Sequence, residues 1–148
     1  MIQERLQSRG LTLPQAPVAA GNYLPFVQSG SLVFVSGQLP VKDGQMIKGK
    51  VGAEVSLEEA QEAARRCLLN GLAILNGIAP LEKMRIVRLG GFVASAPGFT
   101  DQPKVINGAS DLLVELLGEQ GKHARAAVGV AELPLGASVE IELTAELL

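Results

Sequence analysis

The clearest regularity in the chain is the alternation of apolar and polar side chains over residues 138–147. Every second position is apolar, and these positions hold Val139, Ile141, Leu143, Ala145 and Leu147. A period of two predicts a β-strand with one buried face, because successive side chains of a strand point to opposite sides. We expect residues 125–132 to be its antiparallel hairpin partner, joined through the short connection 133–136.

Two segments have the three- and four-residue spacing of amphipathic helices. The first starts at a capping box, in which Ser56 accepts from the amide of Glu59 and Glu59 accepts from the amide of Ser56. Its apolar stripe consists of Ala60, Ala64, Cys67, Leu68, Gly71, Leu75 and Ile78. The second helix follows an N-cap at Thr100-Asp101 and ends at Gly118. Its stripe consists of Val105, Ile106, Ala109, Leu112, Leu113, Leu116 and Leu117.

Shorter β-rich runs complete the pattern at residues 32–35, 45–47 and 86–95, after a lead-in to about Pro17 that starts with a helical turn. Gly90-Gly91 inside the third run predicts a bulge or a closely approaching backbone. The order β-β-β-α-β-α-β-β belongs to the α+β class, with one sheet and two helices on one of its faces. The other face then needs polar cover or a partner.

Composition narrows the possibilities further. The 148 residues fit one domain, residues 1–148, and carry 13 Lys+Arg against 15 Asp+Glu, a formal charge of −2. This balance gives no excess of positive charge that would bind the phosphate backbone of nucleic acid. One cysteine and one histidine exclude an internal disulfide and a Cys/His zinc set, so we expect no metal. No stretch reaches the length of a membrane span and no signal peptide is recognisable, which favours a cytoplasmic location.

Four side chains remain as candidates for a catalytic or binding role. Cys67 lies on a buried helical stripe, which favours core packing over catalysis. His123 is read first as a loop residue, although its closeness to Arg125 leaves a site role open. Glu140 shares a strand face with other acids, and Arg125 joins that face only for one register of the expected hairpin. A structural ion pair and a site for a carboxylate substrate both fit this arrangement.

Several segments, in order and spacing, resemble one family, the RidA/YjgF reactive-intermediate deaminases. The segments are Gly21-Asn22-Tyr23, the strand end Ser36-Gly37-Gln38, Asn107 of the second helix, and Ala124-Arg125-Ala126 followed fifteen positions after the arginine by Glu140. The resemblance implies a chorismate-mutase-like α+β protomer with a mixed sheet, and a homotrimer with sites between subunits. It implies hydrolysis of 2-imino acids or enamines to 2-oxo acids and ammonia.

The resemblance also implies roles for individual residues. Arg125 would hold the substrate carboxylate and Glu140 would deprotonate the attacking water. The pocket would be lined by Tyr23, Ser36, Gly37, Asn107 and Ala127. Ala127 departs from the family pattern, which often has cysteine there. Imines hydrolyse spontaneously, so such a site needs no metal or organic cofactor.

Two other functions stay open. A non-catalytic member of the same fold would bind a small carboxylate in the same cleft. An endoribonuclease, as some family members are labelled, conflicts with the negative net charge.

Overall fold

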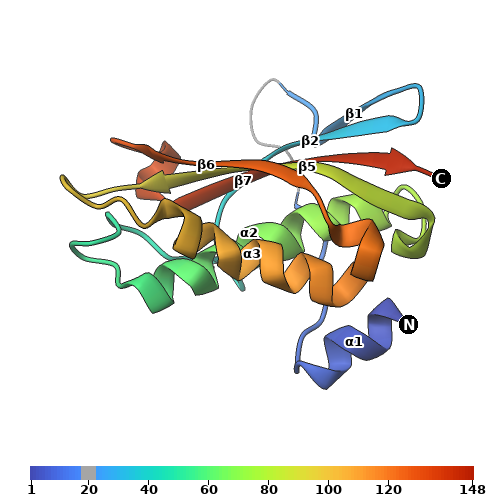
Figure 1. Cartoon of the computed structure of the whole chain (residues 1–148), viewed down its shortest axis with the longest axis horizontal. Coiled ribbons are helices and arrows are strands. Elements are labelled where there is room, and N and C mark those ends of the chain that lie inside the picture. The colour runs from blue at the N-terminus through green and yellow to red at the C-terminus, as the bar shows by residue number, and fades with distance from the viewer. Residues whose placement is uncertain (18–22) are drawn as a thin grey trace.

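The computed structural model of the chain describes residues 1–17 and 23–148. Two long helices, α2 (Leu57–Asn76) and α3 (Gln102–Leu117), lie side by side against one face of a five-stranded sheet (Figure 1). In spatial order the strands are β1 (Phe26–Ser29), β2 (Leu32–Gln38), β7 (Val139–Leu147), β5 (Met84–Ala94) and β6 (Ala124–Val130). The β5–β6 pair is parallel and the other pairs are antiparallel. The expected α+β fold with one mixed sheet and helices on one face is confirmed.

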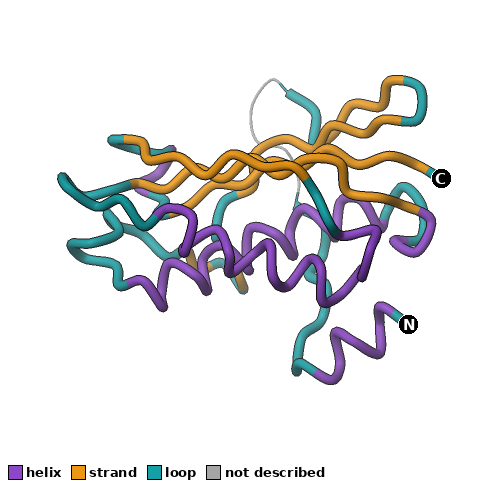
Figure 2. Tube along the Cα trace, viewed as in Figure 1, coloured by secondary structure: helices purple, strands orange, loops and turns teal. Residues whose placement is uncertain are grey.

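Smaller elements surround this layer pair (Figure 2). Helix α1 (Ile2–Ser8) packs near the C-terminal end of α3, where Arg5 donates to the carbonyl of Leu116 at 2.8 Å. Strands β3 (Val41–Lys42) and β4 (Gln45–Met46) form a separate hairpin whose two turn residues both have positive φ. Single turns of 3-10 helix are η1 (Leu81–Lys83), η2 (Gly118–Gly121) and η3 (Pro134–Gly136).

One hydrophobic core fills the space between the helices and the sheet. The apolar residues of β7 contribute to it, as the alternation predicts, and Cys67 is fully buried within it. The capping box of Ser56 and Glu59 is formed, with both hydrogen bonds at 3.1 Å. A Cβ on Gly71 would lie 2.9 Å from Cδ1 of Leu143, so the glycine lets α2 pack tightly on β7.

The predicted hairpin between residues 125–132 and 138–147 is wrong. Strand β6 pairs with β5 in parallel, and β7 lies between β2 and β5. The physical reason is the helix between the strands, because β5, α3 and β6 form a βαβ unit whose crossover helix lets two strands run in the same direction. Within the described part of the chain β6 is therefore an edge strand, paired on one side only.

Two irregularities bend the sheet. The β5 register shifts between Ile86 and Arg88, so the bulge lies at Val87 and not at Gly90-Gly91. The atoms that come closest to the two glycines belong to side chains, and not to the backbone that was the other expectation. The two glycines leave room for neighbouring side chains to pack against the backbone. A Cβ on Gly91 would lie 2.6 Å from Ile106, and a Cβ on Gly90 would lie 2.8 Å from Glu142. The second shift lies in β2 between Val35 and Gln38, opposite β7.

Candidate functional site

The β2 irregularity creates the first of two groups of candidate residues. It brings Gly37 directly beneath Glu140 of β7, where a Cβ on the glycine would lie 2.1 Å from Oε2 of the glutamate. Any other residue at this position would displace the carboxylate. Glu140 therefore lies against bare backbone, half-buried, on the face of the sheet that carries no helices. We call Tyr23, Ser36, Gly37 and Glu140 the acidic half-site.

Hydrogen bonds tie the segment after Tyr23 to the same strand. The Ser36 hydroxyl donates to the carbonyl of Leu24 at 2.6 Å, and the Ser36 amide donates to the carbonyl of Pro25 at 2.9 Å. Tyr23 is 53% exposed beside this anchor. Gly21 and Asn22, the other members of the tyrosine motif, lie outside the described residues.

The environment of Glu140 favours its protonated form. Burial raises the pKa of Glu140, and the neighbouring carboxylate of Glu142 raises it further. Glu142 itself lies against the backbone of Gly90 on the next strand. A carboxylate with a raised pKa can take a proton more readily than an ordinary surface glutamate, which is the property of a general base.

The second group lies at the edge strand. Arg125 of β6 donates from Nη1 to the Ser110 hydroxyl at 3.1 Å and from Nη2 to the carbonyl of Pro103 at 3.4 Å. Both acceptors belong to α3, and Asn107 lies on the same helical face, because positions 103, 107 and 110 are separated by about one turn each. Ala127 is two residues after Arg125 and so shares its side of the strand. We call Asn107, Arg125 and Ala127 the arginine half-site.

The two half-sites lie on opposite faces of the sheet. In the register, Arg125 aligns with Leu89 and Leu143, which point toward the helices. Glu140 aligns with Phe92 and is an odd number of residues from Leu143, so it points to the open face. The register that would have placed Arg125 beside the acids of β7 is therefore not formed. Within the described part of one chain, Arg125 and Glu140 share no cavity.

Neither Arg125 nor Glu140 has an ionic partner within residues 1–17 and 23–148, where six ion pairs form between other side chains. The structural ion pair that the sequence left open is thus not formed. Two of the five N–H groups of Arg125 are used by α3, which leaves three for a ligand. That is sufficient for a two-pronged contact with a carboxylate.

Sequence reasoning missed Ser110 and left His123 open. Ser110 Oγ lies 2.9 Å from Nε2 of His123, and Nδ1 of His123 lies 2.6 Å from the carbonyl of Gly121. His123 is therefore not a solvated loop residue but contacts the α3 residue that holds Arg125. The helical spacing of Pro103, Asn107 and Ser110 was the available signal.

Cys67 has no place in either half-site. Burial raises the pKa of its thiol well above the ordinary value, and the charge of Glu140 raises it further. Its Sγ lies 3.6 Å from the carbonyl of Val139. The thiol is thus protonated and packed, as the helical stripe predicts.

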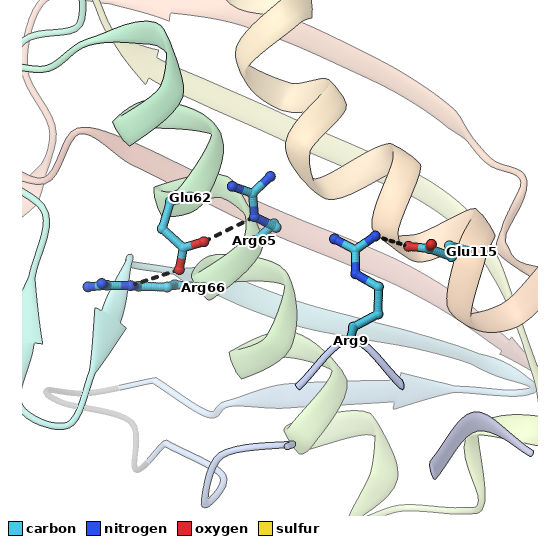
Figure 3. A network of polar contacts seen from close by, with 5 residues as sticks. All are labelled: Arg9, Glu62, Arg65, Arg66 and Glu115. Carbon is cyan, nitrogen blue, oxygen red and sulfur yellow. Dashed lines mark hydrogen bonds and ion pairs between the residues drawn. The ribbon is translucent and has the colours of Figure 1, made fainter. Parts of the chain in front are cut away.

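A cavity of about 690 Å³ lies next to the acidic half-site. It is bordered by the N-terminal lead-in, the end of β2 and α2, and its lining includes Tyr23 and Gly37 but neither Arg125 nor Glu140. Figure 3 shows the charged side chains at this part of the helix layer: Glu62 lies between Arg65, at 3.0 Å, and Arg66, at 3.4 Å, and Arg9 contacts Glu115 of α3. Of these partly exposed pairs, Arg9–Glu115 joins the lead-in to α3 and the two pairs of Glu62 lie within α2. Each contributes at most about 1 kcal/mol.

In the residues that the structure describes, no group of three or more His, Cys, Asp or Glu side chains is arranged to hold a metal ion. No helix in the same residues is long and apolar enough to cross a membrane.

An α+β protomer with an open sheet face and a divided set of site residues is the class of protein that these observations define. The model of the family described as "YjgF/chorismate mutase-like, putative endoribonuclease" matches residues 3–147. The chain belongs to this family, the RidA/YjgF family, and the resemblance seen in the sequence is confirmed.

Among curated relatives, protein TCP17 of Trypanosoma cruzi is 45% identical over 99% of this chain and 94% of its own length. A 2-iminobutanoate/2-iminopropanoate deaminase of Dermatophagoides farinae is 32% identical over 90% of this chain and 92% of its own.

Among solved structures, a protein of unknown function from Agrobacterium tumefaciens is 49% identical, with a TM-score of 0.92 over 99% of this chain and 92% of its own. The E. coli protein TdcF with bound serine is 28% identical, with a TM-score of 0.66 over 89% and 93% of the two chains.

Proposed function

We propose that this protein hydrolyses 2-imino acids, or their enamine tautomers, to 2-oxo acids and ammonia. The observation that carries the proposal is the pair of unpartnered charged groups, an arginine with three free N–H donors and a half-buried glutamate packed against Gly37. The deaminase relative and the serine bound in TdcF support a small ligand that carries a carboxylate.

The proposed reaction assigns one task to each half-site. Arg125 binds the substrate carboxylate in a two-pronged contact, which lysine cannot reproduce. Glu140 accepts a proton from a water molecule as the water oxygen bonds to the imine carbon. When the imine starts in its protonated form, Glu140 returns this proton to the nitrogen of the resulting carbinolamine. As the C–N bond breaks, Glu140 accepts the hydroxyl proton and the carbonyl of the 2-oxo acid forms. Glu140 then gives this proton to the departing ammonia, which leaves as ammonium, and the carboxylate is restored.

A complete site requires a second copy of the chain, because Arg125 and Glu140 point to opposite faces of the sheet. In the proposed homotrimer the edge strand β6 of one protomer lies over the open sheet face of the next. That face carries exposed apolar residues between its acids, namely Val27, Phe34 and Val128. Their contact with a neighbour would remove apolar surface from water, which favours association.

The function is tested by generating 2-iminopropanoate with a serine dehydratase and timing the formation of the 2-oxo acid. We expect micromolar protein to accelerate this step, and Arg125→Ala and Arg125→Lys to lose at least about a hundredfold in kcat/KM. Lys104→Ala, an exposed cation on α3, is the matched control and should keep full activity. An intact protein that binds 2-oxobutanoate but gives no acceleration would overturn the proposal in favour of a non-catalytic carboxylate-binding member.

A further inference from the structure

A continuous series of hydrogen bonds leads away from Arg125 into the protein. It passes from the guanidinium to the Ser110 hydroxyl at 3.1 Å, from this hydroxyl to Nε2 of His123 at 2.9 Å, and from Nδ1 of His123 to the carbonyl of Gly121 at 2.6 Å. The groups come from β6, α3 and the end of η2. These hydrogen bonds thus connect three consecutive elements of the chain.

The chemistry of the groups fixes the direction of two of the bonds, and the form of the His123 ring decides the third. A carbonyl only accepts, so Nδ1 of His123 carries the hydrogen that bonds to Gly121. A guanidinium only donates, so the Ser110 oxygen accepts from Arg125. In the neutral imidazole Nε2 is then an acceptor, and the Ser110 hydroxyl donates to it. With a neutral ring, every member of the series donates in the same sense, from Arg125 to Ser110 to His123 to Gly121.

Arg125 depends on this series for its placement. Its side chain starts from an edge strand, and an arginine carries about 2 kcal/mol of rotamer entropy when it is free. The contact with Pro103 is long, at 3.4 Å, so Ser110 provides the better anchor. Ser110 in turn is held on a rigid helix, and its hydroxyl can be oriented only if an acceptor lies behind it.

We propose that Ser110 and His123 are positioning residues for Arg125. The neutral form of His123, protonated on Nδ1, orients the Ser110 hydroxyl, and the hydroxyl oxygen holds the guanidinium so that its free N–H groups face the ligand carboxylate. This role rests on the proposed function for its catalytic consequence, but the orientation itself is a property of the free protein.

The first test uses an isosteric pair, Ser110→Thr and Ser110→Val, which differ by a hydroxyl and a methyl group. We expect Ser110→Thr to remain close to the wild type, and Ser110→Val to raise KM for the imine, and Kd for 2-oxobutanoate, about tenfold with kcat changed less than about threefold. His123→Ala should resemble Ser110→Val. Lys122→Ala, next to the histidine and bonded only to Glu119, is the control and should change neither constant.

The second test reads the histidine directly by NMR. The protein has a single histidine, so ¹⁵N-histidine labelling gives one set of imidazole signals. We expect the neutral ring to be protonated on Nδ1, and its Nε2 signal to move toward that of an unbonded nitrogen in Ser110→Val but not in Ser110→Thr. A neutral ring protonated on Nε2 would overturn the assigned direction of the series.

The outcomes separate this inference from the proposed function. If the wild type hydrolyses the imine and the Thr and Val variants behave alike, the positioning role is wrong and the function stands. If the wild type shows neither turnover nor binding, the function fails, and the order parameter of the Arg125 side chain decides the inference alone: it should be lower in Ser110→Val than in Ser110→Thr. Equal values in the two variants would overturn it.

Discussion

Two features of its surroundings shift the pKa of the Glu140 carboxyl group: its burial and the charge of Glu142. Because burial and the Glu142 charge each raise the pKa of Glu140, each favours the protonated carboxyl group. The sign for stability follows: the contribution of Glu140 to the free energy of unfolding is fully present below the ordinary glutamate pKa and is lost as the pH rises through the raised pKa of Glu140. For the proposed general base the sign for activity is opposite, because the base must be ionised, so we expect turnover to increase over the same pH range.

Replacing Glu142 separates the effect of burial on the pKa of Glu140 from the effect of the neighbouring charge. Glu142→Gln removes the repulsion but leaves the burial, so we expect the acidic limb of the kcat/KM profile to move to lower pH and stability at neutral pH to increase. The measurement is kcat/KM against pH together with the melting temperature. Glu146→Gln, on the same strand face, is the matched control. An unchanged acidic limb in Glu142→Gln would show that Glu140 is not the base.

Gly37 offers a substitution that moves one carboxylate and little else. The Cβ of Gly37→Ala would lie 2.1 Å from Oε2 of Glu140, at the flexible end of a side chain, so the glutamate turns away while the backbone stays. We expect a folded protein with kcat/KM lowered about a hundredfold. Gly90→Ala displaces Glu142 in the same manner and should cost much less. Equal losses in the two variants would contradict the special role of the Gly37 contact.

At the scale of secondary structure, local patterns predict elements more reliably than they predict neighbours. The capping box of Ser56, the stripe through Cys67 and the alternation around Leu143 each depend on residues close in the sequence, and each is formed. The pairing of β6 is different, because alternation shows which side of a strand is buried but not which strand lies beside it. The order strand, helix, strand over residues 84–130 was the available indication of a parallel pair.

The contact between the two long helices depends on Gly108. A Cβ at this position would lie 2.6 Å from the backbone oxygen of Gln61 on α2, and backbone cannot move aside as a side chain can. The better helix propensity of alanine, about 1 kcal/mol, is therefore outweighed. We expect Gly108→Ala to lower the free energy of unfolding by about 1–3 kcal/mol.

Urea unfolding at a fixed protein concentration measures this effect. Gly71→Ala is the matched control, since its new Cβ would meet only the tip of Leu143, at 2.9 Å. Gly71→Ala should cost less than Gly108→Ala. A Gly108→Ala variant as stable as the wild type would show that the helices separate without cost.

At the scale of the whole molecule, the sequence offers candidate site residues but does not show how one chain arranges them. Arg125 and Glu140 are recognisable by their spacing, yet one chain directs them to opposite sides of its sheet. In the proposed homotrimer they meet through the contact between copies, which no periodicity within one chain encodes. The hydrogen bond between Ser110 and His123 was not predicted for a similar reason, because it joins a helix to a loop through tertiary packing.

Mixing two inactive variants tests whether copies share a site. Arg125→Ala and Glu140→Gln should each be inactive alone, and together should recover about a quarter of the wild-type activity when subunits mix at random. Mixed oligomers are verified by native mass spectrometry on differently tagged chains. Mixed oligomers without recovered activity would mean that both residues act within one chain or do not act together.

The division of the half-sites also has a genetic consequence. In a ring where each centre takes its arginine from one copy and its glutamate from the next, a chain that has lost only the arginine silences one centre and still serves another. A chain damaged on both faces silences two. An allele of the first kind should therefore leave about half of the centres complete beside the normal copy, whereas a doubly damaged allele should leave about a quarter, as should two alleles that affect opposite faces.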